Sequence, residues 1–148
     1  MKRTVLFVCT GNYYRSRYAE LLFNAMQVKG WQATSRGLAL SPRNRGSIWP
    51  PVLERLQQCG FAVPDELPLP RTLSEADLAQ ATLVIALNEP EHRPLMQQRF
   101  PAWADRIAYW QVPDADVLEP ETAFQRIEAG IAALQKELSG SYGDRGYF

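Results

Sequence analysis

A cysteine, an arginine and a serine lie close together near the start of the chain, in the segment CTGNYYRS that begins at Cys9. Gly11 and Asn12, which follow the cysteine, are residue types that tolerate the positive φ angles of a tightly curled loop. Such a loop can direct successive backbone N–H groups at one point and form an anion-binding nest at a helix amino terminus. A thiol held there beside Arg15 is expected to be ionised at neutral pH, and therefore to act as a nucleophile.

The same loop has the donors that a transferring phosphoryl group requires. The loop amides and the planar guanidinium of Arg15 match the three equatorial oxygens of that group, and the Ser16 hydroxyl can donate to a Cys9 thiolate. The cysteine–arginine spacing alone is weak, because thirteen of the 148 residues are arginine. The alternative is a structural thiol packed at the end of a strand. The elements that flank the loop favour the nucleophile.

Those flanking elements are a buried strand and a helix. Residues 4–9 form a continuous β-branched and aromatic run, and the next apolar residues have helical spacing over 16–28. Ser74 with Asp77 resembles a capping box that opens a short helix. Further strands are predicted at 32–37, 82–87 and 107–110, and further helices at 50–59, 89–99 and about 121–138.

Strands that alternate with helices predict an α/β fold, in which a four-stranded parallel sheet lies between helices in three αβα layers. For this sheet we expect the flavodoxin-like strand order 2-1-3-4. Ligands bind such folds beyond the carboxyl ends of the strands. Cys9 ends the first strand and Asp114 follows the last one, so both are expected at the same edge of the sheet. Residues 1–140 are expected to form a single domain and residues 141–148 a flexible tail.

Composition argues against several functional classes. Sixteen basic residues balance sixteen acidic ones, which disfavours binding to nucleic acid or a membrane surface through net charge. Two cysteines make no disulfide framework and favour a reducing compartment. The apolar run at 4–8 is too short for a signal peptide, and nothing approaches the length of a membrane span. We expect a cytoplasmic monomer or weak dimer with no nucleic-acid or membrane partner.

The loop resembles the signature Cys-x-Gly-Asn-x-Cys-Arg-Ser-Pro of the low-molecular-weight protein tyrosine phosphatases. The likeness extends to the later segments TSRGL, PRTLSEADL, TLVIAL and VPDAD, and so covers most of the chain. It implies that Cys9 is the nucleophile, Arg15 the phosphate clamp and Asp114 the general acid and then base. The implied phosphate-binding residues are Thr10, Gly11, Asn12, Tyr13, Tyr14, Arg15 and Ser16, with Asn12 holding the loop in shape and Ser16 stabilising the thiolate.

The chain departs from this family pattern at three places. Tyr14 replaces the second loop cysteine, so the vicinal disulfide that protects many members cannot form, and Arg17 replaces the usual proline. The acid segment reads DAD from Asp114 to Asp116 instead of Asp-Pro-aromatic, which leaves Asp116 as a rival acid and removes one aromatic wall. Tyr13 and Tyr14 could offer aromatic surface from the other side.

Other reactive residues are expected to be structural. Cys59, at a helix end, should pack in the core, and His92, the single histidine, should be exposed on a polar helix. Trp49 could line the rim of the pocket or pack at a helix start. No metal or cofactor is expected, because Arg15 and the loop amides already supply positive charge.

The resemblance implies a phosphatase that hydrolyses aryl phosphate monoesters through a phosphocysteine. Its substrate would be a phosphotyrosine-bearing protein or a small aryl phosphate. One alternative is an arsenate reductase on the same scaffold, but that chemistry relays oxidation through further cysteines and only Cys59 is available. The other is a regulatory module that binds anions in the loop and has no competent acid.

Overall fold

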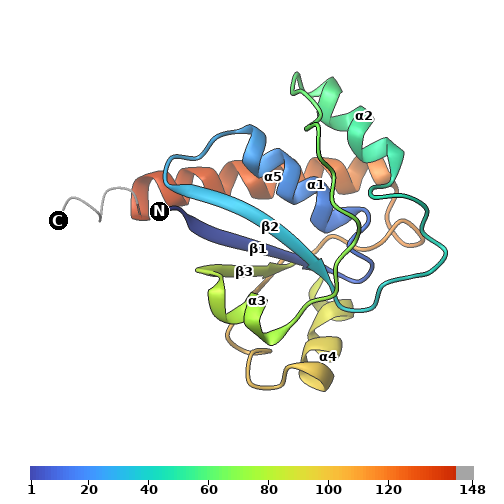
Figure 1. Ribbon diagram of the computed structural model, residues 1–148, viewed down its shortest axis with the longest axis vertical. Coiled ribbons are helices and arrows are strands. Elements are labelled where there is room, and N and C mark those ends of the chain that lie inside the picture. Colours follow the sequence, from blue (N-terminus) through green and yellow to red (C-terminus); the bar gives the residue numbers. More distant parts are fainter. Residues whose placement is uncertain (143–148) are drawn as a thin grey trace.

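The structure, a computed structural model, describes residues 1–142, and its regular elements follow the predicted order (Figure 1). The strands are β1 (Arg3–Cys9), β2 (Trp31–Gly37), β3 (Leu83–Ala86) and β4 (Ala108–Tyr109). The helices are α1 (Arg15–Ala25), α2 (Pro50–Gln58), α3 (Glu75–Gln80), α4 (Glu89–Arg99) and α5 (Pro120–Glu137), followed by the π-helical turn η1 (Leu138–Tyr142). Residues 143–148 of the predicted tail lie outside the described residues. Within residues 1–142, no helix combines the length and apolar character needed to cross a membrane.

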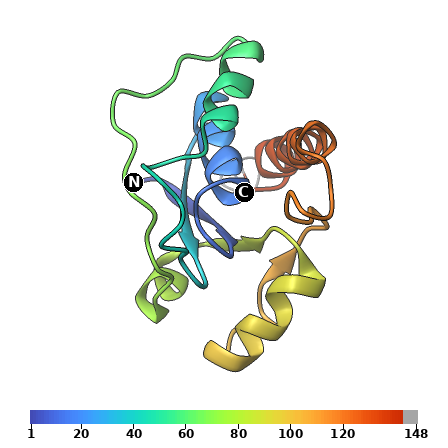
Figure 2. The same ribbon diagram turned by 90° about the vertical axis from the view of Figure 1, so that its right-hand side faces the viewer.

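The four strands are parallel and hydrogen-bonded in the order β2-β1-β3-β4, which confirms the predicted α/β fold. β1 is central, and its last five residues are buried, as its continuous apolar sequence predicts. Cys9 pairs in register with Gly37 of β2, and Val8 pairs with Ala86 of β3. The three strands therefore end at one edge of the sheet, which faces the viewer in Figure 2.

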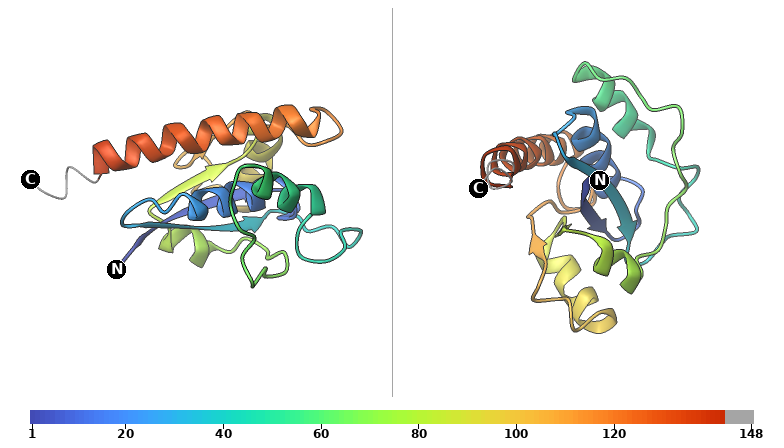
Figure 3. Two further views of the ribbon diagram at one scale, coloured as in Figure 1. Left: turned by 90° about the horizontal axis from the view of Figure 1, so that it is seen from above. Right: turned by 60° about the vertical axis from the view of Figure 1, so that its left-hand side comes forward.

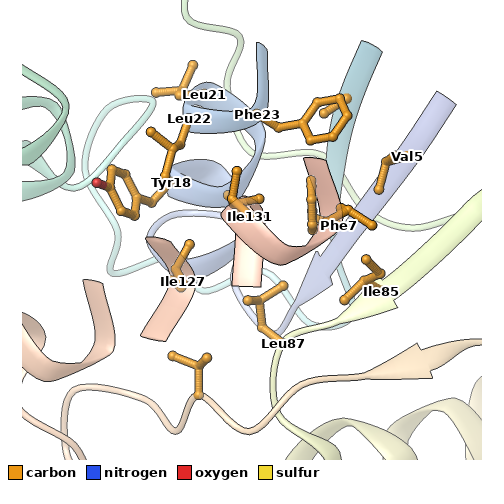
Figure 4. Packing of buried hydrophobic residues seen from close by; sticks show 14 of the residues in the cluster. Val5, Phe7, Tyr18, Leu21, Leu22, Phe23, Ile85, Leu87, Ile127 and Ile131 are labelled. Carbon is orange, nitrogen blue, oxygen red and sulfur yellow. The ribbon is translucent and has the colours of Figure 1, made fainter. Parts of the chain in front are cut away.

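Helices cover both faces of this sheet. α1 and α5 lie on one face with α2 packed against α1, and α3 and α4 lie on the other (Figures 1 and 3). Because side chains alternate along a strand, Phe7 points into the first layer, and Leu6 and Val8 into the second. The larger cluster fills the space between β1, α1 and α5 (Figure 4), with the Phe7 ring 6.3 Å from that of Phe23. The predicted apolar stripe of α5 is buried: Phe124, Ile127, Ile131, Leu134 and Leu138.

α1 and β4 are shorter than the sequence predicts, in each case for a local reason. α1 ends at Ala25 instead of continuing to Val28, because Gln27 adopts a left-handed φ of 51° and the Val28 carbonyl accepts the N–H of Trp31. This turn places Val28 in the core. β4 is only two residues long, since it pairs with β3 at two positions. The predicted capping box at Ser74 is present and opens α3.

Cys59 is exposed, so the prediction that it packs in the core is wrong. It caps the carboxyl end of α2, where it follows the buried Val52 and Leu56 on the same side of the helix but lies beyond the last buried turn. Its sulfur lies 3.5 Å from the Tyr18 hydroxyl and from the Glu128 carboxylate. The helix therefore buries one narrow face, and its last turn leaves the cysteine at the surface.

Candidate active site

The loop between β1 and α1 curls tightly against the end of β2. Of the two residues expected to adopt positive φ, Asn12 does so, with φ of 52°, whereas Gly11 does not. The loop carbonyl of Thr10 accepts the N–H of Ala39 at 2.8 Å. A Cβ atom on Gly37 would lie 2.8 Å from that same carbonyl oxygen and 3.0 Å from the Asn12 side chain. The absence of a side chain at Gly37 therefore lets the loop close over β2.

A buried hydrogen-bond network fixes the left-handed residue Asn12. Its side-chain N–H groups donate to the hydroxyls of Ser16 at 3.0 Å and Ser35 at 2.9 Å, and its carbonyl accepts the backbone N–H of Arg71 at 2.9 Å. Ser35 in turn donates to Glu20 at 2.5 Å. Ser35, Glu20 and Arg71 were missed from sequence because they come from β2, α1 and the segment before α3. Asn12 thus ties three separate segments to the loop.

The Cys9 sulfur lies at the base of the loop, 2.9 Å from the Ser16 hydroxyl oxygen. The residue is only 2% exposed. Because Asn12 donates to the Ser16 oxygen, the hydroxyl proton of Ser16 is free to point at the sulfur. The Ser16 hydroxyl is thus placed to donate a hydrogen bond to the Cys9 sulfur.

Arg15, the first residue of α1, is 2% exposed and is held through its two terminal nitrogens. Nη1 donates to the Val112 carbonyl at 2.9 Å and to Glu91 at 2.9 Å, and Nη2 donates to the other Glu91 oxygen at 2.8 Å. The Asp114 carboxylate lies 3.6 Å from Nη2. Burial alone lowers the pKa of Arg15, but the pairing with Glu91 and the nearby anions raises it above its usual value. The guanidinium is therefore permanently charged.

Glu91, in the first turn of α4, is the carboxylate that sequence analysis missed. It accepts from both terminal nitrogens of Arg15 and from the hydroxyl of Thr10. Burial tends to raise the pKa of Glu91, but hydrogen bonds from His92, Arg15 and Thr10 together hold it far below the usual value. Glu91 is thus ionised throughout the neutral range. Only its position in the sequence could have indicated it, because the first turn of a helix that follows a parallel strand lies at the edge of the sheet where ligands bind.

His92 is completely buried, so the prediction that it is exposed is wrong. α4 begins directly at the sheet edge, and its first turn therefore packs against the loop, despite the polar sequence of the helix. The Nδ1 atom of His92 accepts the backbone N–H of Asn88 at 2.9 Å, and Nε2 lies 3.1 Å from the Thr10 hydroxyl. Burial lowers the pKa of His92, with Glu91 opposing, so the ring is neutral at pH 7.

Asp114 and Asp116 follow β4 and line a pocket of about 620 Å³ together with Glu91. The side chain of Asp114 is 51% exposed, with one oxygen toward Arg15 and the other accepting the N–H of Ala115 at 2.8 Å. Among residues 1–142, Asp116 makes no ion pair. The structure therefore brings Asp114, and not its rival, into contact range of the guanidinium.

The two loop tyrosines have different environments. Tyr14 is buried, with its ring 4.8 Å from that of Trp49 and 5.8 Å from that of Phe124, and burial raises its pKa to about 12. It offers no exposed aromatic surface, contrary to the prediction. Tyr13 is partly exposed, and its hydroxyl donates to the Arg45 carbonyl at 2.7 Å. Trp49 caps α2 and donates its backbone N–H to the Tyr13 carbonyl, so it belongs both to a helix start and to the wall beside the loop.

The fold and the loop agree with comparisons to known proteins. The family model described as low molecular weight phosphotyrosine protein phosphatase matches residues 4–141. The chain is 28% identical to a protein-arginine-phosphatase of Bacillus subtilis (strain 168) over 121 residues, or 78% of each protein. It is also 28% identical to the low molecular weight protein tyrosine phosphatase from T. tengcongensis, with a TM-score of 0.71 over 93% of this chain and 97% of that one. An arginine phosphatase from Geobacillus stearothermophilus has the same fold, with a TM-score of 0.78 at 22% identity over 96% of both chains.

Proposed function

Because the chain belongs to the low molecular weight phosphotyrosine protein phosphatase family, we propose that it hydrolyses phosphotyrosine-type aryl phosphate monoesters through a phosphocysteine intermediate. Cys9 is the proposed nucleophile, Arg15 the phosphate clamp and Asp114 the general acid and base. One observation carries the proposal: the Asp114 carboxylate lies 3.6 Å from Arg15, at the sheet edge where β1 ends at Cys9. This relationship supports the proposal that the three residues act on one substrate as nucleophile, anion clamp and proton donor.

The proposed reaction has two displacement steps. In the first, the Cys9 sulfur attacks phosphorus while the bond to the aryl oxygen breaks, and Asp114 gives its proton to that oxygen. In the second, the Asp114 carboxylate takes a proton from water as the water oxygen attacks phosphorus, which releases the thiolate and inorganic phosphate. Throughout, Arg15 and the loop N–H groups stabilise the equatorial oxygens, and Ser16 donates to the sulfur when it leaves.

Two substrate classes, phosphotyrosine and phosphoarginine, fit the groups around the loop. The ring of Tyr13 is partly exposed on one side of the loop, and its backbone carbonyl accepts the N–H of Trp49. This aromatic surface favours a substrate with an aryl group. A second candidate substrate is phosphoarginine. The likeness to an arginine phosphatase favours it, as do the carboxylates of Glu91, Asp114 and Asp116 in the adjoining pocket, which suit a cationic group.

The proposed mechanism is tested with two aryl phosphates that differ in leaving group. Cys9→Ser should abolish turnover of both, which would also exclude a module that only binds anions. Asp114→Ala should lower kcat about 10²–10⁴-fold with phenyl phosphate, and less with p-nitrophenyl phosphate, whose phenolate leaves without a proton. Asp116→Ala is the matched control and should stay near the unaltered rate. If Asp116→Ala lowers kcat with phenyl phosphate and Asp114→Ala does not, the acid is Asp116.

Substrate choice is tested separately with two peptides of identical sequence, one carrying phosphotyrosine and one phosphoarginine. We expect the higher kcat/KM with phosphotyrosine, and Tyr13→Ala should lower that value while leaving the phosphoarginine value little changed. A higher kcat/KM for the phosphoarginine peptide would contradict the aryl assignment and leave the phosphocysteine mechanism standing. Arsenate turnover that depends on thioredoxin would instead favour the reductase.

A further inference from the structure

The proposed mechanism uses one side of the Arg15 guanidinium and leaves the groups behind it without a role. Those groups are Glu91 and His92 of α4, which meet the loop at Thr10. We propose that Glu91 is a positioning residue that sets which edge of Arg15 faces the phosphate, and that His92 holds Glu91 in place through Thr10. This inference rests on the proposed role of Arg15 as the phosphate clamp.

The contacts of Arg15 leave a single edge of the guanidinium for a ligand. Glu91 accepts from Nη1 and Nη2 together, and the Val112 carbonyl takes the second proton of Nη1. Within residues 1–142, Nε donates to no protein group. The edge formed by Nε and the remaining proton of Nη2 is therefore the one that can bind phosphate with two parallel hydrogen bonds.

The direction of every hydrogen bond behind Glu91 follows from a backbone donor. The N–H of Asn88 can only donate, so Nδ1 of His92 accepts and the neutral ring carries its proton on Nε2. That proton points to the Thr10 hydroxyl oxygen at 3.1 Å and also lies near Glu91. The Thr10 hydroxyl then has its own proton free for Glu91. A single arrangement of protons satisfies the whole series from Asn88 to Arg15.

Removing the Glu91 charge has two opposing effects on phosphate binding. A carboxylate near the site repels the phosphate dianion, so its loss alone would tighten binding. However, a buried guanidinium without its partner turns toward the nearest remaining anion, and the Asp114 carboxylate is 3.6 Å from Nη2. Pairing with Asp114 would occupy the free edge of Arg15. We therefore expect the loss of orientation to dominate and phosphate binding to weaken.

Alkylation of Cys9 measures this effect without any turnover. Iodoacetamide modification of Cys9 is followed by peptide mass spectrometry in a Cys59→Ser background, because Cys59 is exposed. Protection of Cys9 by increasing inorganic phosphate gives a dissociation constant. For Glu91→Gln we expect this constant to rise about tenfold or more, with alkylation in the absence of phosphate not slowed. General damage to the loop would instead slow the alkylation as well.

Two further variants complete the test. Glu89→Gln is the matched control, since Glu89 lies on the same helix and pairs with Arg93 instead, and its phosphate constant should change less than about twofold. His92→Asn keeps an acceptor for the Asn88 N–H but is too short to reach Thr10. It should weaken phosphate binding in the same direction as Glu91→Gln by a smaller factor, and it carries the test if Glu91→Gln does not fold.

The outcomes separate this inference from the proposed function. Tighter phosphate binding in Glu91→Gln would show that charge repulsion dominates and would overturn the positioning role. Unchanged binding in both Glu91→Gln and His92→Asn would overturn it as well. If phosphate fails to protect Cys9 in the Cys59→Ser parent, the clamp itself is wrong, and the proposed function fails together with the inference.

Discussion

The side-chain amide of Asn12 donates to the hydroxyl oxygen of Ser16 at 3.0 Å, and this bond leaves the Ser16 proton available to another acceptor. The oxygen of Ser16 also lies 2.9 Å from the Cys9 sulfur. Because its oxygen accepts from Asn12, the hydroxyl keeps its own proton available for donation to the sulfur. Asn12 therefore shapes the loop through its left-handed backbone and also contacts the hydroxyl that lies against the Cys9 sulfur.

Replacement of Asn12 by alanine should slow the alkylation of Cys9. The variant loses three side-chain hydrogen bonds and places alanine at a left-handed φ of 52°. Together these changes cost about 1–3 kcal/mol of folding stability. Without Asn12, the Ser16 hydroxyl is free to turn away from the sulfur. We expect iodoacetamide modification of Cys9 at neutral pH to slow about tenfold.

Asn24→Ala is a matched control for this variant. Asn24 also makes two hydrogen bonds between α1 and β2, to the backbone of Ala33, but away from the loop. Its loss should lower stability by a similar amount and leave Cys9 alkylation unchanged. Equal alkylation rates in the Asn12→Ala and unaltered proteins would contradict the expected dependence of Cys9 reactivity on the Asn12 contacts.

Gly37→Ala should lower both stability and activity. The added methyl group would lie 2.8 Å from the Thr10 carbonyl oxygen, which is backbone and cannot rotate away. Either β2 or the loop must shift, at a cost of about 1–3 kcal/mol. Since the loop carries Cys9, we expect kcat/KM for p-nitrophenyl phosphate to fall more steeply than the melting temperature alone would explain. Gly60→Ala is the comparison for stability alone, because a φ of 91° strains alanine there while no group near the loop is disturbed. Kinetics in Gly37→Ala equal to those of the unaltered protein would contradict this prediction.

Peroxide should inactivate the protein without forming a protective disulfide. Tyr14 stands at the position of the second loop cysteine, and its buried ring packs against Trp49. An oxidised Cys9 then has no thiol neighbour in the loop, and the oxidation proceeds to sulfinic and sulfonic acids that reductants do not reverse. Mass spectrometry of the Cys9 peptide should show added oxygen.

The Cys59→Ser variant provides the control for this oxidation. Cys59 is exposed at the end of α2, where it contacts Tyr18 and Glu128, so its removal should change neither the rate nor the reversibility of inactivation. A bridge between Cys9 and Cys59 in the oxidised monomer, with activity restored by dithiothreitol, would overturn the prediction.

The fold was predictable because it depends on regular patterns. The uninterrupted apolar run of β1 and the stripe on α5 each describe an element buried in a known way, and the alternation of elements then restricts the sheet to parallel order. The boundaries were less predictable where a single backbone angle ends an element. Gln27 is such a position, because nothing in its residue type favours a left-handed conformation.

Only part of the candidate site was predictable. The placement of Cys9, Arg15 and Asp114 at one edge of the sheet follows from the loop pattern and from the rule that parallel strands end at the same edge. Glu91 and His92 have no local motif, and a polar helix sequence favours an exposed histidine. They are wholly or partly buried because α4 starts at the sheet edge and its first residues contact Thr10. This contact joins segments far apart in the sequence, so no local pattern indicates it.

Acidification should destabilise the protein in two steps because the pKa values of His92 and Glu91 are both depressed in the folded state. Burial lowers the pKa of His92, so the unfolded chain takes up a proton near pH 6.5 before the folded protein does. The stability from neutral His92 is present in full above pH 6.5 and is lost as the pH falls through the folded pKa. In the same way, the stability that ionised Glu91 contributes is present in full above about pH 4.5 and is lost as the pH falls further. Melting temperatures measured from pH 7.5 to 3.5 should therefore decline first below pH 6.5 and further below pH 4.5.

His92 is the single histidine of the chain, so the upper step can be assigned to it directly. In His92→Asn, which has no group that titrates near pH 6.5, the melting temperature should be lower at pH 7 and nearly constant down to about pH 5. In the unaltered protein, protonation of the ring would break the buried hydrogen bond from the Asn88 N–H to Nδ1. In the variant, the side-chain carbonyl that accepts this N–H does not titrate. An upper step of equal size in the variant would mean that His92 is not the group whose titration causes it.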